Sequence, residues 1–319
     1  MKVFRVFFPL CLAFGAPAIA TAAPDCAAPA AVSGPVENYS PVFSACRDAA
    51  GAQRLATRAF TAGGTKMLLT VDPQSLRTQI APAACWTCAP TTNEAQKDTR
   101  LMRAVAGAGA DIHKGGPVSQ NAGLTHGAGE GAYVTGDLCP TAKPLDRSFI
   151  ETMMKQGPHT PLALAVSGLW IKEHPADFQW LVARKREGAL DISWVDHSYR
   201  HRYTPKLDET KNYLMQPGSN IDAEITETEK TLISAGQTPS VFFRFPGLVA
   251  DAALMEKLRA RHLVALGADA WLVLSPPPRA GSVVLVHPNG NEPAGIRLFS
   301  KYLEAGKIPR PFRRIEDAP

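Results

Sequence analysis

From Ala132 onward, short apolar segments alternate with amphipathic ones, and this alternation limits the possible folds more than any other feature of the chain. Alternating strands and helices are typical of a parallel sheet or an α/β barrel, in which each helix covers the strands beside it. The sequence therefore predicts an α/β fold here. We expect strands at 132–135, 162–166, 191–195, 241–245, 262–266 and 282–286, and helices at 145–156, 176–187, 221–235 and 251–261.

The preceding part of the chain has a different composition. Residues 24–125 are rich in Ala, Gly, Pro and Thr, with a predicted strand at 66–71 and predicted helices at 50–60 and 93–106. The glycine-rich stretch 107–131 is typical of a long connection. We therefore divide the chain into a mixed N-terminal extension of unassigned role (23–125), a barrel (126–305) and a C-terminal tail (306–319).

The first 22 residues have the pattern of a secretory signal peptide. Lys2 and Arg5 precede an apolar run at 6–20, and a small-residue Ala-Thr-Ala pattern ends at Ala22, after which we expect cleavage. A membrane anchor is the alternative, but the run is short for a spanning helix and contains two prolines and a glycine. We expect a periplasmic or secreted protein with no stable membrane span. Its mature charge of about +3 does not favour nucleic acid as a partner.

Cysteine usage agrees with an oxidising compartment. Five cysteines follow the predicted signal peptide, so at least one thiol stays unpaired within the chain. Cys85-Trp-Thr-Cys88 has a spacing that serves redox chemistry or half of a zinc site, but no second C-x-x-C follows it. We favour a structural disulfide between Cys85 and Cys88.

Polar side chains suited to chemistry come directly after, or at the ends of, the predicted strands. In α/β barrels the active site is built at the carboxyl ends of the strands, where side chains distant in sequence converge. This placement predicts one active site. Its candidate residues are Asp137, His197, His201, Arg244, Asp269 and His287.

The spacing in His197-Ser-Tyr-Arg-His201 is that of two residues on one face of a helical turn. Two imidazoles placed in this way can reach one metal ion. An isolated pair with this spacing is more often structural or on the surface. Its position directly after a strand favours a metal site.

Taken together, the motifs at 132–303 resemble those of the polysaccharide deacetylase family (NodB homology, carbohydrate esterases), whose members remove acetyl groups from glycans. His197-Ser-Tyr-Arg-His201 is an unbroken match to the family's metal-binding His-Ser/Thr-x-x-His. The other segments keep the family's order: Thr135-Gly-Asp-Leu-Cys-Pro140 for Thr-Phe-Asp-Asp-Gly-Pro, Val166-Ser-Gly-Leu-Trp170, Arg244-Phe-Pro-Gly247 for Arg-x-Pro-Tyr, Asp269-Ala-Trp271, and Leu285-Val-His287. The resemblance implies a distorted (β/α) barrel of the polysaccharide deacetylase type.

The resemblance also implies roles for individual residues. Asp137 would be the catalytic base, His197 and His201 would bind a divalent metal, with zinc favoured, and His287 would be the general acid. Arg244 would orient Asp137, and a carboxylate such as Asp269 would hold His287. The simpler alternatives are a solvated arginine at a strand end and an aspartate that caps a turn.

One metal ligand of the family is missing, because the second aspartate of the first motif is Leu138. Catalytic zinc usually has three protein ligands and a water molecule. Either Cys139 or Asp137 itself could complete the site, and each choice changes the mechanism.

We therefore expect a metal-dependent hydrolase that cleaves the carbon–nitrogen bond of acetamido groups on a polysaccharide or oligosaccharide. Trp170, Tyr199 and Trp271 are candidates for stacking on sugar rings. The alternative is an inactive relative of the deacetylases that binds glycan without hydrolysing it.

Overall fold

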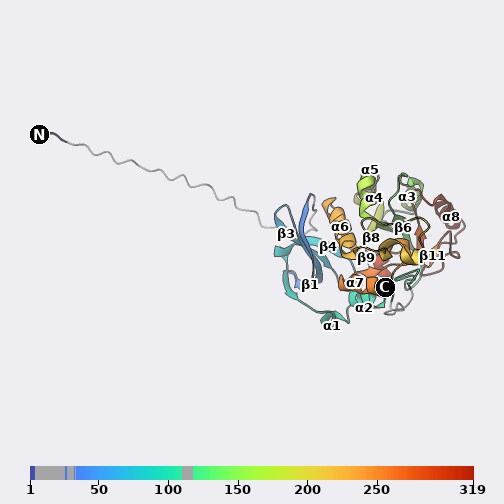
Figure 1. Ribbon diagram of the computed structural model, residues 1–319, viewed down its shortest axis with the longest axis horizontal. Helices are drawn as coiled ribbons and strands as arrows, with labels where there is room; N and C mark the ends of the chain where they lie inside the picture. Colours follow the sequence, from blue (N-terminus) through green and yellow to red (C-terminus); the bar gives the residue numbers. More distant parts are fainter. Residues whose placement is uncertain (4–25, 27–31, 33, 110–117) are drawn as a thin grey trace.

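The computed structural model describes residues 1–3, 26, 32, 34–109 and 118–319, and the chain forms two β-sheets (Figure 1). The predicted signal-peptide core and its cleavage point lie outside the described residues. Among the residues that are described, no helix is both long enough and apolar enough to cross a membrane.

The larger sheet has seven parallel strands and carries the predicted site. Its strand order is β10-β9-β8-β7-β6-β12-β11, which leaves β10 and β11 as the two edges of an open, distorted barrel. The α/β fold class is thus confirmed. The strands are β6 (Tyr133–Leu138), β7 (Thr160–Val166), β8 (Leu190–Asp196), β9 (Pro239–Phe243), β10 (Val264–Ala265), β11 (Ala270–Trp271) and β12 (Val283–Val286).

Six helices accompany this sheet, four of them predicted. Polar side chains at several of the N-termini accept hydrogen bonds from the first turn, as Asp146 and Asn220 do. The short α4 and the amphipathic α8 were not predicted. The helices are α3 (Arg147–Met154), α4 (Gly168–Glu173), α5 (Pro175–Arg186), α6 (Ile221–Ser234), α7 (Ala252–Ala260) and α8 (Pro293–Glu304).

Successive residues of β7 face opposite sides of the sheet. Leu162 and Leu164 pack in one hydrophobic cluster with residues of α3, α5 and α8, whereas Ala163 and Ala165 belong to a second cluster on the other face. The sheet is therefore buried on both faces, as parallel sheets generally are.

The segment from residue 118 to 131, part of the predicted long connection, runs across the opening between the two edges. Ser119 bridges to Ala250, Leu124 bridges to Leu266 beside β10, and His126 bridges to Ser282 beside β12. Backbone hydrogen bonds from this segment thus tie together elements that are not neighbours in the sheet.

The N-terminal extension forms a second, antiparallel sheet with the order β4-β3-β2-β1-β5. The strand predicted at 66–71 is confirmed as β3. The predicted helix at 50–60 is wrong, because this Ala-rich segment forms β2 and pairs with strands on both sides, which overrides its local preference. The strands are β1 (Val36–Arg47), β2 (Gln53–Ala62), β3 (Thr65–Val71), β4 (Thr78–Pro82) and β5 (Thr87–Pro90).

A further predicted helix, at 93–106, is two helices. They are α1 (Asn93–Gln96) and α2 (Arg100–Gly107). The break lies where the hydroxyl of Thr99 accepts a hydrogen bond from the Met102 N–H and caps α2.

Disulfides in this sheet differ from the prediction. Cys85 and Cys88 are not bonded to each other; the bonds are Cys26–Cys85 and Cys46–Cys88. Cys88 lies on β5 directly opposite Cys46 on β1, and this register brings the two thiols together. Cys85, three residues earlier, bonds to Cys26 instead. Cys139 is the free thiol among the described cysteines.

A buried ion pair joins the two sheets. Arg58 on β2 donates to both carboxylate oxygens of Glu229 on α6, at 2.8 and 2.9 Å, and each side chain is about 1% exposed. The hydroxyl of Tyr39 on β1 donates to the same carboxylate at 2.8 Å. Helix α6, which lies between the sheets in Figure 1, therefore connects the N-terminal sheet to the parallel sheet.

Candidate active site

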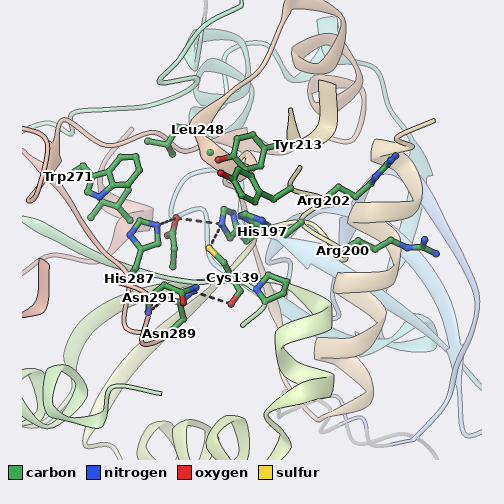
Figure 2. A pocket seen from close by; sticks show the side chains of 16 residues that line it. Cys139, His197, Arg200, Arg202, Tyr213, Leu248, Trp271, His287, Asn289 and Asn291 are labelled. Carbon is green, nitrogen blue, oxygen red and sulfur yellow. Dashed lines mark hydrogen bonds and ion pairs between the residues drawn. The ribbon is translucent and has the colours of Figure 1, made fainter. Parts of the chain in front are cut away.

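Several of the predicted site residues line one pocket of about 430 Å³ at the carboxyl ends of the parallel strands (Figure 2). Asp137 and Cys139 come from the end of β6, and His197 and His201 follow β8. On the opposite wall lie Trp271 of β11 and His287, which follows β12. The topology of the sheet thus assembles residues that are 150 positions apart in sequence.

Asp137 is fixed by Arg244, and both side chains are buried. One guanidinium nitrogen of Arg244 donates to Asp137 Oδ1 at 2.6 Å and to the Thr135 hydroxyl at 2.8 Å. The other two nitrogens donate to the carbonyls of Leu266 and Gly267. Arg244 is therefore not a solvated charge at a strand end: it holds one carboxylate oxygen and leaves Oδ2 facing the pocket.

The two histidines are positioned by a tight loop. The Nδ1 atom of His197 lies 2.8 Å from the Arg244 carbonyl, which can only accept a hydrogen bond, so Nδ1 carries the proton in the neutral ring. The Nε2 atom is then free to bind a metal, and it lies 3.6 Å from Asp137 Oδ2. The His197 and His201 rings meet edge to face, with centroids 4.7 Å apart.

The expectation of a helical turn between these histidines is wrong. Ser198 and His201 have left-handed backbone angles, with φ of 62° and 46°. Their amides are held by side chains: Asp196 accepts from the Ser198 N–H and the Ser198 hydroxyl accepts from the His201 N–H. Glu224 of α6 accepts from the Arg200 N–H at 2.6 Å. The imidazoles converge because the loop curls back, and not because of helical periodicity.

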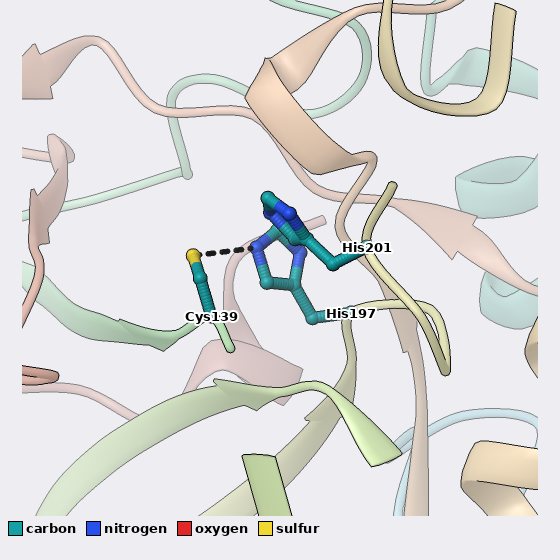
Figure 3. A group of neighbouring side chains, drawn as sticks. All are labelled: Cys139, His197 and His201. Carbon is teal, nitrogen blue, oxygen red and sulfur yellow. Dashed lines mark hydrogen bonds between the residues drawn. The ribbon is translucent and has the colours of Figure 1, made fainter. Parts of the chain in front are cut away.

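Leu138 and Cys139 lie on opposite sides of the strand end. Leu138, at the position of the family's second aspartate, is fully buried in a hydrophobic cluster. Cys139 points into the pocket, with Sγ 3.5 Å from His197 Nε2 (Figure 3). Burial would raise the pKa of the Cys139 thiol, but His201 and His197 lower it well below its usual value. The sulfur thus lies where a thiolate is stabilised.

His287 faces Asp137 across the pocket, with 4.0 Å between His287 Nε2 and Asp137 Oδ2. Its Nδ1 lies 3.2 Å from Glu292, whose carboxylate also accepts from the Trp271 indole N–H at 3.0 Å. Burial opposes protonation of His287, but hydrogen bonding with Cys139 and Glu292 raises its pKa to about 10. These contacts favour the protonated form of the His287 ring.

Asp269 does not hold His287, contrary to the expectation. It accepts from the Val283 N–H at 3.0 Å and contacts His126 Nδ1 at 2.7 Å, at the amino ends of β11 and β12. Glu292, and not Asp269, is the carboxylate that contacts His287 Nδ1. The sequence reasoning missed Glu292 because it lies in the loop before α8, outside any strand-end pattern.

The three candidate aromatic residues have different locations. Trp170 is fully buried in the hydrophobic core and cannot contact a sugar. Tyr199 packs against Gly168 and does not line the pocket. Trp271 does line it, together with Tyr203 and Tyr213, which were not predicted.

The residues present are suited to a metal ion. One ligand atom each from Cys139, His197 and His201 lies within 4.8 Å of the others. Imidazole nitrogen and thiolate sulfur are ligands that zinc prefers. The carboxylate of Asp137 lies beside this group but is already paired with Arg244.

No protein-family model matches the chain. Among solved structures, it is similar to a family 4 carbohydrate esterase from Bacillus anthracis, at 18% identity over 62% of this chain and 87% of that one, with a TM-score of 0.43. A family 4 carbohydrate esterase from Bacillus subtilis matches at 15% identity over 61% and 84%, with a TM-score of 0.44. A family 4 pseudoenzyme from Bacillus anthracis matches at 16% identity over 57% and 64%, with a TM-score of 0.38. These three solved structures are described as two family 4 carbohydrate esterases and one family 4 pseudoenzyme.

Proposed function

We propose that the chain is a metal-dependent hydrolase that removes acetyl groups from a carbohydrate or polysaccharide. The observation that carries the proposal is the convergence of a buried carboxylate and three histidines on one open pocket. Asp137, His197, His201 and His287 supply these groups. Amide hydrolysis needs an activated water, a stabilised oxyanion and an acid for the leaving amine, and this set provides groups for each task.

Metal binding would use the imidazoles of His197 and His201. A divalent metal such as zinc, when bound there, polarises a carbonyl and lowers the pKa of water. Asp137 takes a proton from water through its free Oδ2, while Arg244 holds the other oxygen and keeps the carboxylate oriented. Because Arg244 is fully buried, this orientation is rigid.

His287 delivers a proton to the departing amine from Nε2. Glu292 holds the opposite ring nitrogen and thereby fixes both the tautomer and the orientation of the ring. The raised pKa of His287 keeps the proton available at neutral pH. His287 Nε2 and Asp137 Oδ2 lie 4.0 Å apart in the same pocket, so the acid and the base can both reach one bound substrate.

The residues that line the pocket indicate the class of substrate. Trp271, Tyr203 and Tyr213 offer aromatic faces and polar atoms, which is the usual composition of sugar-binding sites. The substrate we propose is an acetylated polysaccharide or oligosaccharide. Export to the periplasm or the medium, as the N-terminal sequence predicts, would place the protein beside such polymers.

A second function, glycan binding without hydrolysis, is favoured by one observation. Leu138 replaces an acidic metal ligand and is packed in the core, so it cannot take part in a metal site. If the remaining ligands bind metal too weakly, the pocket would hold a glycan without cleaving it.

The test is to equilibrate the purified protein with zinc, measure bound metal by mass spectrometry, and assay acetate release from acetylated oligosaccharides. We expect near-stoichiometric zinc, lost in a His197→Ala/His201→Ala double variant, and acetate release that a chelator stops. His159→Ala, an exposed histidine outside the pocket, is the matched control. His287→Ala should abolish turnover while keeping the metal. Absence of zinc from the unaltered protein would refute the hydrolase and leave glycan binding.

A further inference from the structure

We propose that Cys139 is the third protein ligand of the metal, so that the centre consists of one thiolate and two imidazoles. This goes beyond the proposed hydrolase but rests on its metal dependence. The position of the missing carboxylate is occupied by Leu138, whose side chain is unavailable because it lies in the core. The sulfur replaces that carboxylate from the next position in the chain.

The backbone explains why the neighbouring residue takes over. Side chains alternate between the two faces of a strand, so Asp137 and Cys139 line the pocket while Leu138 packs in the hydrophobic cluster on the other side. The amide of Asn289, from the loop after β12, donates to the Cys139 carbonyl at 3.2 Å and fixes the turn that follows β6. Cys139 therefore has a defined place at the pocket floor.

The distances are those of a metal site. Zinc bonds of about 2.3 Å to sulfur and 2.0 Å to nitrogen, at a tetrahedral angle, separate the two ligand atoms by roughly 3.5 Å. Cys139 Sγ and His197 Nε2 are 3.5 Å apart. The ligand atom of His201 completes a group whose members are all within 4.8 Å of one another. Figure 3 shows the sulfur directed at the two rings.

Asp137 is the competing ligand, and its contacts argue against it. Its Oδ1 is 2.6 Å from the Arg244 guanidinium, and this cation withdraws negative charge from the carboxylate. Binding the metal through Oδ2 would also consume the one group placed to act as base. With Cys139 as the ligand, three protein ligands leave a fourth position open and Asp137 remains free.

The ligand set also determines which metals can bind. Thiolate and imidazole favour zinc or cobalt, whereas magnesium and calcium prefer oxygen ligands. The centre should therefore bind cobalt(II) with a direct sulfur–cobalt bond, which produces an intense charge-transfer absorption in the near ultraviolet. Oxygen and nitrogen ligands alone do not give this band.

The experiment uses the full chain with both disulfides intact and a Cys11→Ser change, which leaves Cys139 as the one thiol outside the disulfides. Cobalt(II) is titrated while the spectrum is recorded, and thiol reactivity toward a disulfide reagent is measured with and without zinc. We expect a sulfur–cobalt band at one equivalent and a thiol that zinc protects. Cys139→Ser should lose the band and weaken zinc binding by more than the roughly 10–100-fold typical of outer-shell changes.

Cys139→Asp is the discriminating variant, since it restores a carboxylate. It should keep the metal but lose the sulfur–cobalt band. Thermal unfolding of each metal-free variant shows whether the fold is intact. Cobalt bound without the band, together with a thiol that zinc does not protect, would overturn the role of Cys139 but leave the hydrolase standing. No metal bound by the parent protein would overturn both proposals.

Discussion

The buried ion pair between the two sheets offers the sharpest test of how the N-terminal sheet is held. In Arg58→Met, the guanidinium is replaced by an apolar chain of similar length, and Glu229 stays behind as a buried, uncompensated charge. The variant also gives up hydrogen bonds from Arg58 to the carbonyls of Thr57 and Arg261, both at 2.9 Å. Among the described residues, the Tyr39 hydroxyl is then the remaining side-chain donor to the carboxylate.

The expected cost is large, because both side chains are about 1% exposed. Removing one partner of a buried pair typically costs about 3–5 kcal/mol. One further feature favours the upper part of that range, because the Arg58–Glu229 contact is bidentate.

Equilibrium unfolding in urea, with the disulfides intact, measures this cost. With a slope near 3 kcal/mol per molar urea, a cost of about 4–5 kcal/mol should lower the midpoint by about 1.3–1.7 M. Lys230→Met is the matched control on the same helix, because Lys230 pairs with Glu227 at the surface and its loss should cost under about 1 kcal/mol. Equal midpoints for the Arg58→Met and Lys230→Met variants would refute the reasoning.

Three further predictions concern the site and the interface between the sheets. Glu292→Gln should lower kcat by about 10–100-fold with little change in KM, because the carboxylate orients His287; an unchanged kcat would contradict this role. Burial lowers the pKa of His262 to about 4, so protonation favours the unfolded chain and stability should fall by up to about 3 kcal/mol between pH 6.5 and 4. Urea unfolding across that range should show the loss in the unaltered protein and a smaller one in His262→Gln. Glu224→Met should weaken zinc binding about 10-fold, because it removes the acceptor of the Arg200 N–H between His197 and His201, the proposed metal ligands; unaltered affinity in a metal titration would show that Glu224 has no such role.

Part of the fold was readable from the sequence because it depends on local order along the chain. Apolar segments of strand length alternating with amphipathic helices can bury their faces only as a covered parallel sheet. The carboxyl ends of such strands meet at one edge, so the side chains that follow them meet as well. For this reason Asp137, His197, His201 and His287 could be grouped before any contact was known.

Other features depend on contacts between distant segments, and only the tertiary structure decided them. The segment of β2 favours a helix locally but becomes a strand because it is paired on both sides. The disulfide partner of Cys88 follows from the register of β1 and β5. Glu292, and not Asp269, reaches His287 because the loop before α8 folds over the strand ends.

The proposed metal site shows the same division at the scale of single residues. The sequence alone determined that two histidines follow one strand and that Leu138 stands where the motif of the resembled family has a second aspartate. It could not place Cys139 beside His197, because that contact joins β6 to β8 across the intervening β7 and depends on how far each strand extends. The order of elements along the chain determines which side chains lie at the same edge of a sheet. Packing and strand register determine which of those side chains are in contact.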